Sequence, residues 1–273
     1  EASSFQLTYS KFIKPDYALL LNITNDHLDW HGNKLNYINS KFKIFKLQKK
    51  TNYALLNDKL KKEFKKRNFK SKLIVPRFKN YKKFKNKIFN SYLKSNINDE
   101  NMTHVFALSK LLHIKEKDFI KSVNTFKGLP HRYEIFLKKN NSVFINDSKA
   151  TSFESSKFAL KNSCNTFWIV GGLPKKNDKI ILNNLKKNIV KSYIIGKNIN
   201  FFKNQIKHKI KYFVAKDLKN SLIQISKDIK NFKYTNNTIL LSPAAASYDQ
   251  FINFEKRGEE FKKLSKQYAN KYF

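Results

Sequence analysis

Short apolar runs recur at regular intervals along the second half of the chain, and polar residues or glycines follow them. The runs that we expect to form strands are residues 142–145, 167–170, 192–195, 212–215 and 238–241. Runs that are continuously apolar, rather than alternating, are typical of strands that are covered on both faces. Apolar residues at helical spacing occur in residues 218–229 and 251–268. This alternation predicts a parallel sheet with right-handed crossovers.

The first half of the chain has a less regular pattern. Its predicted strands are residues 17–23, 52–56 and 73–75, and its predicted helices are residues 102–112 and 119–126. Glycine and proline within residues 127–130 interrupt the pattern, so we expect a domain boundary there. A chain of 273 residues is long enough for two domains of ordinary size.

The composition is that of a folded protein, and its cysteine content is compatible with a reducing compartment. Hydrophobic residues make up 41% of the chain, which is enough to build cores. No apolar run approaches the length needed to cross a bilayer and no signal segment opens the chain, so we expect no membrane insertion. The single cysteine, Cys164, cannot form an internal disulfide, which suits the cytoplasm.

The formal net charge of +36 has two explanations. A surface that binds nucleic acid or an anionic membrane would carry such a charge. Alternatively, a bias toward A- and T-rich codons enriches lysine together with asparagine, isoleucine, phenylalanine and tyrosine. The lysines are spread along the chain and far outnumber the arginines, whereas bidentate recognition of phosphates and bases favours arginine. We therefore favour the compositional bias and expect no nucleic-acid partner.

A dense group of polar residues follows the predicted strand at residues 142–145. Asn146, Asp147, Ser148, Lys149 and Thr151 offer an amide, an acid, two hydroxyls and an ammonium within six residues. In parallel sheets, ligands bind beyond the carboxyl ends of the strands. This loop is therefore a candidate binding site, and the serine that follows it at position 152 could cap the next helix.

Other polar segments follow apolar runs in the same way, although each one alone has an ordinary explanation. Gly171-Gly172 alone predicts only a loop, and Arg132 with Glu134 alone predicts only a surface ion pair. Their fixed order is more informative than any single segment. The seven segments are EASSFQL, NITNDHLDWHG, KFKIF, FKGLPHRYEIF, NDSKATS, GGLPKKND and LSPAAASYDQFINFEKRGEEF. Taken together, they resemble the Mur ligase family over the whole chain, and NDSKATS with LSPAAASYDQF resembles its D-glutamate-adding branch.

The resemblance implies an α/β fold in two parts. Residues 1–128 would be the remainder of a central P-loop-type ATPase domain with a parallel sheet. Residues 129–273 would be a Rossmann-like α/β C-terminal domain that binds the amino acid. The family's uridine-nucleotide domain and Gly-rich phosphate loop have no counterpart in this sequence, which has only 6 glycines. On this interpretation the chain is an N-terminally truncated fragment that is inactive alone.

The implied reaction is the ATP-dependent formation of an amide between D-glutamate and UDP-N-acetylmuramoyl-L-alanine, in peptidoglycan precursor synthesis. The carboxylate would first be phosphorylated, and the amine would then attack the acyl phosphate; catalysis of the first step is mostly positioning and charge neutralisation. ATP and Mg²⁺ are the implied cofactors. The resemblance further implies a monomeric cytoplasmic enzyme whose partners are small molecules.

The resemblance also assigns roles to residues of the first part of the chain. Glu1, His27 and Lys41 match the magnesium site, and Lys41 matches a lysine that the family carbamylates, which would turn a repelling ammonium into an anionic ligand. Ser3 and Gln6 match positions that contact the muramoyl-alanine substrate, and Asn101 matches a position that contacts the nucleotide. His104 stands where a second asparagine is usual, so its role is left open.

In the second part of the chain, the resemblance divides the residues between ATP and the amino acid. Arg132, Asp147 and Lys149 match positions near the nucleotide, and Arg132 and Lys149 would neutralise phosphate charge. D-glutamate would be held by an ammonium, two hydroxyls and backbone, at Thr151, Lys175, Ser247 and Phe254. His131 would contact the muramoyl-alanine substrate. Lys41, His27, Lys149 and Arg132 are therefore the expected catalytic residues.

Two alternatives remain open from the sequence. The first keeps the ligase chemistry but changes the amine, as in other Mur-type or folylpolyglutamate-type ligases. The second is a basic nucleic-acid-binding protein, which would gather arginine and aromatic residues on one face.

Overall fold

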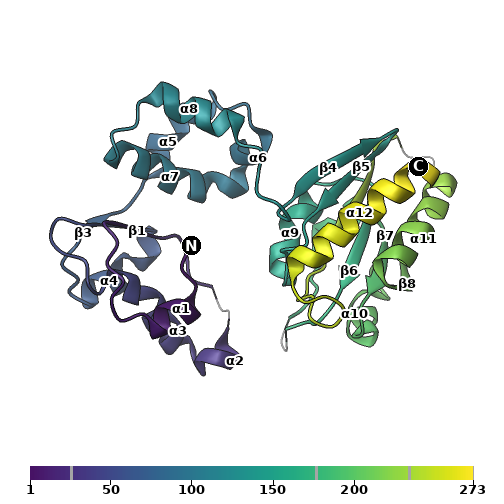
Figure 1. Cartoon of the computed structure of the whole chain (residues 1–273), viewed down its shortest axis with the longest axis horizontal. Helices are drawn as coiled ribbons and strands as arrows, with labels where there is room; N and C mark the ends of the chain where they lie inside the picture. The colour runs from purple at the N-terminus through teal and green to yellow at the C-terminus, as the bar shows by residue number, and fades with distance from the viewer. Residues whose placement is uncertain (25–26, 176–177, 233–234, 273) are drawn as a thin grey trace. The chain divides into compact units, whose positions relative to one another are not determined.

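The computed structural model of the protein describes residues 1–24, 27–175, 178–232 and 235–272. The chain forms two compact units, Glu1–Lys127 and Gly128–Phe273 (Figure 1), and each is described by itself. Asn25 and Asp26 of the NITNDHLDWHG segment, and Lys176 and Asn177 of GGLPKKND, lie outside the described residues.

A three-stranded parallel sheet forms the centre of the first unit. Its order is β1 (Tyr17–Leu20), β2 (Tyr53–Leu56) and β3 (Lys72–Ile74), so the three predicted strands are confirmed, although β1 ends earlier than expected. Phenylalanines of α3 (Lys34–Phe42), the 3-10 helix η1 (Lys43–Phe45) and α4 (Lys61–Lys66) pack on one face of this sheet. The same unit contains α1 (Ser4–Tyr9), α2 (Leu28–His31) and η2 (Asp58–Leu60).

The rest of the first unit is helical and has a core of its own. Its elements are α5 (Phe78–Lys85), α6 (Ser91–Lys94), η3 (Asn96–Asn98), α7 (Asp99–Leu111) and α8 (Glu116–Thr125). Tyr81, Met102, Phe106 and Phe119 are buried between these helices. The predicted helices at residues 102–112 and 119–126 are thus confirmed, each starting about one turn earlier than the apolar pattern indicated.

The second unit is built on a six-stranded sheet in the order β4-β5-β9-β6-β7-β8. The strands are β4 (Glu134–Lys139), β5 (Ser142–Asn146), β6 (Thr166–Gly171), β7 (Ile189–Ile195), β8 (Tyr212–Lys216) and β9 (Asn237–Leu241). All neighbouring strands run parallel except β4, which pairs with β5 in the antiparallel direction. The five predicted strands are confirmed, and β4 was not predicted.

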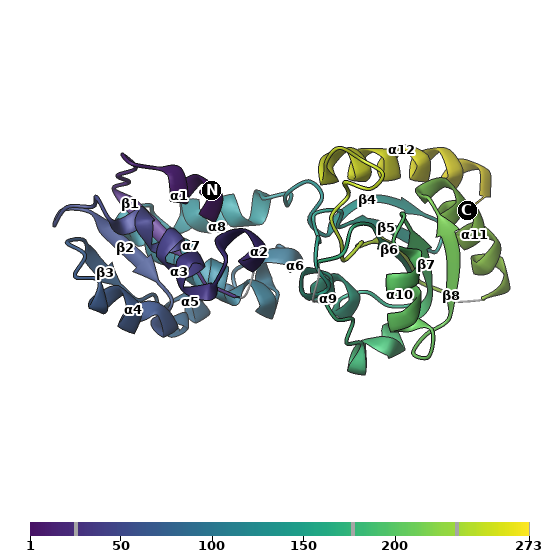
Figure 2. The same ribbon diagram turned by 90° about the horizontal axis from the view of Figure 1, so that it is seen from below.

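Helices cover both faces of this sheet. Figure 2 shows α11 (Leu218–Asn231) and α12 (Phe254–Tyr272) on one side and α9 (Phe153–Lys161) and α10 (Ile199–Ile206) on the other. The 3-10 helix η4 (Asn183–Asn188) follows β6 along the chain. Because both faces are covered, both sets of side chains of the inner strands are apolar, as the continuous runs predicted.

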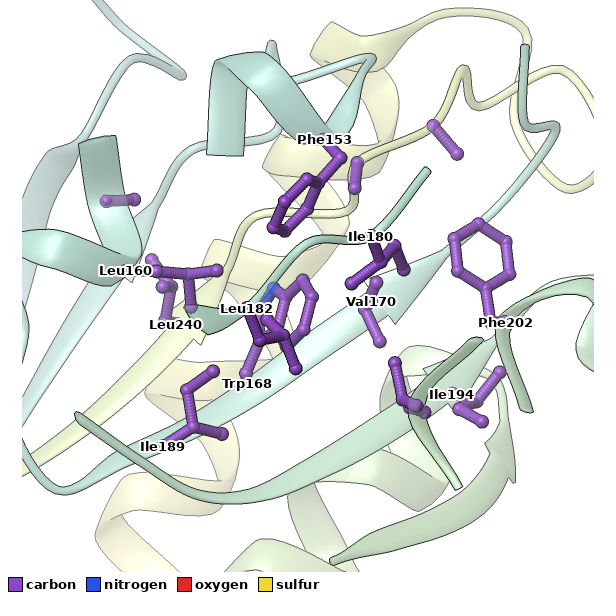
Figure 3. Packing of buried hydrophobic residues seen from close by; sticks show 14 of the residues in the cluster. Phe153, Leu160, Trp168, Val170, Ile180, Leu182, Ile189, Ile194, Phe202 and Leu240 are labelled. Carbon is purple, nitrogen blue, oxygen red and sulfur yellow. The ribbon is translucent and has the colours of Figure 1, made fainter. Parts of the chain in front are cut away.

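Strand β6 illustrates how the two cores are divided. Alternate side chains of a strand point to opposite faces. Trp168 is fully buried with Phe153, Leu160 and Leu182 on one side (Figure 3), whereas Phe167 belongs to the core under α11 and α12. The Trp168 indole Nε1–H donates to the Ser242 carbonyl at 2.7 Å, which satisfies the one polar atom of this side chain.

Ser152 caps α9, as the sequence predicted. Its Oγ accepts from the backbone N–H of Ser155, and α9 begins at Phe153. Ser152→Ala leaves this N–H without its side-chain acceptor, and we expect the free energy of unfolding to fall by about 1 kcal/mol in urea unfolding monitored by circular dichroism. Ser152→Asp, which restores an acceptor, should recover most of the loss. Equal stability of Ser152→Ala and the wild type would contradict this role.

Candidate functional site

The loop after β5 is tied to the end of β9 through Asp147. Its backbone N–H donates to the Leu241 carbonyl at 2.8 Å. Its carboxylate accepts from the Tyr133 N–H at 3.1 Å and from the Ser242 hydroxyl at 2.7 Å. One buried acid therefore holds together the turn before β4, the end of β5 and the end of β9.

The environment of Asp147 changes its acidity. Only 8% of the residue is exposed, and this burial raises the pKa of its carboxyl group to about 7. The hydrogen bonds from Ser242 and Tyr133 and the charge of Arg132 act in the opposite direction. A proton is therefore exchanged at Asp147 close to neutral pH.

Arg257 of α12 is a buried residue of this region that the sequence interpretation missed. Its guanidinium donates from Nε to the Ser148 Oγ at 3.0 Å, and from Nη2 to the carbonyls of Ser148 and Ala245 at 2.8 and 2.9 Å. Burial lowers the pKa of Arg257 to about 10, although the charge of Asp249 opposes this. Arg257 thus joins the loops after β5 and β9 to the start of α12. The only sequence signal was an arginine inside the last family-like segment.

Three predicted site residues lie close together at the start of α12. The Lys149 N–H donates to the His131 carbonyl at 3.0 Å. The Lys149 Nζ lies 5.2 Å from the centroid of the Phe254 ring, and the His131 ring centroid lies 5.9 Å from the same centroid. The Ser148 hydroxyl donates to the Phe254 carbonyl at 2.8 Å. His131, Lys149 and Phe254 are therefore brought together.

Arg132 and Thr151 flank this group. Arg132 is exposed, and its charge acts on the nearby Asp147 carboxylate. Thr151 is half-buried and immediately precedes the cap of α9.

The loops after β6 and β9 run side by side, which places Lys175 and Ser247 on adjacent segments. Leu173 and Ala246 form an antiparallel bridge with N–H to carbonyl distances of 2.8 and 3.0 Å. Gly172 is required at this crossing, because its φ is +134° and an added Cβ would lie 2.3 Å from the Ala246 carbonyl oxygen. Lys175 is exposed on its loop, whereas Ser247 is 2% exposed.

In the first unit, Ser3 and Gln6 bond to each other. The Gln6 N–H donates to the Ser3 Oγ at 3.1 Å, and the Ser3 N–H donates to the Gln6 Oε1 at 2.8 Å. This reciprocal pair is a capping box that starts α1. Glu1 is exposed just before it. The predicted contacts of Ser3 and Gln6 with a substrate stay predictions.

His27 and Lys41 lie in an aromatic group formed by α1, α2 and α3. The His27 ring centroid is 4.8 Å from that of Phe5 and 6.4 Å from that of Tyr37, and the Lys41 Nζ is 6.0 Å from the Tyr37 centroid. His31 is buried nearby, and burial lowers its pKa, helped by the charges of His27 and Lys41. Within the described residues, no three His, Cys, Asp or Glu side chains are grouped closely enough to hold a metal.

Asn101 lies on the exposed side of α7, where its Nδ2 is 3.4 Å from the Asn98 Oδ1. The neighbouring His104 is buried, and its Nδ1 is 2.9 Å from the Glu100 carbonyl. The structure therefore gives His104 a hydrogen bond within its own helix. No helix among the described residues is long and apolar enough to span a membrane.

Comparisons with known proteins identify relatives of this chain. Residues 1–119 match the family model "Mur ligase middle domain". A UDP-N-acetylmuramoylalanine--D-glutamate ligase of Rickettsia felis is 33% identical, over 98% of this chain and 64% of its own length. The protein of the same name from a Hydrogenobaculum species is 30% identical, over 99% of this chain and 67% of its own length.

A solved structure has the same fold. A MurF ligase from Thermotoga maritima in complex with ADP superposes with a TM-score of 0.61 at 16% identity, covering 97% of this chain and 66% of that one. The chain spans only 64% of the length of the Rickettsia felis relative. With the fold, the ordered loops and these relatives in agreement, the chain belongs to the Mur ligase family.

Proposed function

We propose that this chain is the part of an ATP-dependent ligase that joins D-glutamate to UDP-N-acetylmuramoyl-L-alanine in peptidoglycan precursor synthesis. The observation that carries the proposal is that the loops NDSKATS, GGLPKKND and LSPAAASYDQF follow neighbouring strands of one sheet and bond to one another. The names of the relatives support it. We assign residues 1–128 to the ATPase domain and residues 129–273 to the amino-acid-binding domain, and we propose a monomeric cytoplasmic enzyme.

The amino acid would bind where the loops after β6 and β9 run side by side. D-glutamate carries two carboxylates, which require cationic and hydroxyl donors. Thr151, Lys175 and Ser247 supply these donors, and the backbone at Phe254 adds a further contact. The amine of D-glutamate then forms the new C–N bond to the acyl carbon. The C–O bond between the acyl carbon and phosphate breaks, so inorganic phosphate leaves, and the amine nitrogen loses one proton.

The nucleotide would bind next to it, on the other side of the NDSKATS loop. Lys149 and Arg132 neutralise phosphate oxygens as negative charge shifts during transfer. Asp147 already accepts one hydrogen bond on each carboxylate oxygen. Each oxygen keeps a further lone pair for a ribose hydroxyl. Asn101 is the proposed nucleotide contact of the first unit.

Glu1, His27 and Lys41 are the residues that we propose for Mg²⁺. Magnesium prefers oxygen ligands, and an unmodified Lys41 would repel it. The described residues offer one carboxylate and one imidazole of this set, so the fit depends on a carbamate at Lys41, and no reaction step is derived from the metal.

An assay of the protein expressed from the complete gene tests the proposed substrate. ATP and UDP-N-acetylmuramoyl-L-alanine are supplied together with D-glutamate, L-lysine or meso-diaminopimelate, and a folate substrate is offered with L-glutamate in parallel. We expect phosphate release and product only with D-glutamate. Turnover with another amine, or with the folate substrate, would overturn the proposed substrate. High-affinity, salt-dependent DNA binding without turnover would favour the nucleic-acid alternative.

Lys149→Met in the same protein removes a cation that we place at the transferred phosphate. The expected result is a fall in kcat/KM of about 100-fold, typical for loss of one stabilising group at a developing charge. Lys161→Met, at the exposed end of α9, is the matched control and should retain full activity. An unchanged kcat/KM in Lys149→Met would contradict the assigned role.

A further inference from the structure

His131 is held in an unusual backbone conformation before β4. Its φ is +63°, which is costly for a residue with a side chain. Hydrogen bonds on both sides keep it there: its N–H donates to the Glu134 Oε2 at 3.0 Å, and its carbonyl accepts from the Lys149 N–H at 3.0 Å. The orientation of the imidazole is therefore set by the turn and the NDSKATS loop together.

Asn146 determines which imidazole nitrogen can carry the proton. Asn146 is fully buried, and its Oδ1 accepts from the Ser148 N–H at 3.2 Å, which fixes the orientation of the amide. Its Nδ2 lies 3.0 Å from the Glu134 Oε2 and 3.0 Å from the His131 Nδ1. An amide nitrogen can only donate, so the His131 Nδ1 has to be the acceptor.

Glu134 supports the same orientation because it stays ionised. Burial raises the pKa of Glu134, but hydrogen bonds from the His131 N–H, Lys262 and Asn146 outweigh it, so the pKa lies below its ordinary value. Lys262 bonds directly to Oε1. An ionised carboxylate accepts hydrogen bonds only, so the Asn146 amide has to present its Nδ2 to Glu134.

Gly258 of α12 provides the space for this arrangement. A Cβ at this position would lie 2.1 Å from the His131 Nδ1 and 3.0 Å from the Asn146 Nδ2. Any side chain would therefore displace the imidazole from the amide. Position 258, next to Arg257, therefore requires a glycine, because a side chain there would clash with His131.

We propose that Asn146 and Glu134 are positioning residues that hold His131 as a neutral imidazole with its proton on Nε2. No described residue is hydrogen-bonded to Nε2, and Nε2 is not among the fully buried unpartnered atoms. His131 is then a fixed Nε2–H donor beside Lys149, suited to an anionic oxygen of the acceptor substrate. That use of the proton rests on the proposed function, whereas the hydrogen-bonded arrangement does not.

Nuclear magnetic resonance of the histidine ring nitrogens tests the arrangement in the chain without substrates. The chain is labelled with ¹⁵N-histidine and ¹⁵N-asparagine, His131 is assigned with His131→Gln, and spectra are recorded about two pH units above the ordinary histidine pKa. We expect an unprotonated Nδ1, a protonated Nε2 and a through-hydrogen-bond coupling between Asn146 Nδ2 and His131 Nδ1. A proton on Nδ1, or an averaged mixture of the two tautomers, would overturn the proposal.

Two variants test whether Asn146 and Gly258 determine the arrangement of the His131 ring. Asn146→Asp replaces the donor with an acceptor and should move the proton of His131 to Nδ1; a folded variant with Nδ1 still unprotonated would overturn the proposal. If that variant does not fold, Gly258→Ala tests the steric part of the arrangement, because alanine favours the helix and the contacts with His131 and Asn146 oppose it. The coupling should disappear in Gly258→Ala and persist in the exposed control Lys263→Ala, and its persistence in Gly258→Ala would contradict the steric role of Gly258.

These measurements use no substrate, so their outcome is independent of the proposed ligase activity. If His131 proved to carry its proton on Nδ1, the conclusion from the substrate assay would still stand. If the enzyme proved to use a different amine, the conclusion about the His131 tautomer would still stand.

Discussion

Arg257→Ala is expected to lower the free energy of unfolding of the second unit by about 4 kcal/mol. The substitution removes the donors of the Ser148 and Ala245 carbonyls and of the Ser148 hydroxyl, and each buried acceptor left alone costs roughly 1–3 kcal/mol. Removing a buried guanidinium relieves its desolvation cost, which offsets part of the sum. The net loss is still large because three chain segments lose a shared donor at once.

Tryptophan fluorescence isolates this effect. The chain has two tryptophans, Trp30 and Trp168, and Trp168 lies in the core of the second unit. In a Trp30→Phe background, urea unfolding followed at Trp168 should show a much lower midpoint for Arg257→Ala and no change for the exposed control Lys266→Ala. A loss below about 1 kcal/mol would mean that Arg257 does not hold the loops together.

Asp147 should make the stability of the second unit fall as pH rises from about 4 to about 7. The folded pKa of about 7 lies above the ordinary value of 3.8, so the folded state binds more protons between these two values. The stabilisation is complete below the unfolded pKa and is lost as pH passes through the folded pKa. Roughly three pH units at about 1.4 kcal/mol each give a total of about 4 kcal/mol.

Asp147→Asn removes this titration. The difference in unfolding free energy between the variant and the wild type, measured at Trp168 across the same pH range, should change by about 4 kcal/mol in favour of the variant at higher pH. Asp58→Asn, an exposed acid of the first unit, serves as control and should leave the pH profile of the second unit unchanged. Parallel profiles of the wild type and Asp147→Asn would show that Asp147 ionises normally.

The inner strands of the second unit could be predicted because both of their faces are buried. Burial on two faces produces runs such as Phe167–Val170, in which every residue is apolar. Edge strand β4 has no such constraint: its residues are half-buried or exposed, and its pairing with β5 is interrupted between Ile135 and Leu137. Helix α10 was also not predicted, because Phe202 and Ile206 are its only buried residues.

The candidate site could be predicted as a series of loops, because polar residues at strand ends are visible in the sequence. The residues that hold the loops in place could not be predicted in the same way. An arginine on a helix is usually exposed, and the burial of Arg257 depends on acceptors at Ala245, in the loop before α12, and at Ser148, which is far away in the sequence. The contact of Gly258 with His131 is of the same kind. Such contacts depend on tertiary geometry rather than on a local pattern.

The most direct test of the central claim is a crystal structure of the protein from the complete gene with its D-glutamyl product bound. The account predicts that the two glutamyl carboxylates lie within about 3.5 Å of donors on Thr151, Lys175 and Ser247. A D-glutamyl group bound in another place, out of hydrogen-bond reach of all three residues, would contradict it.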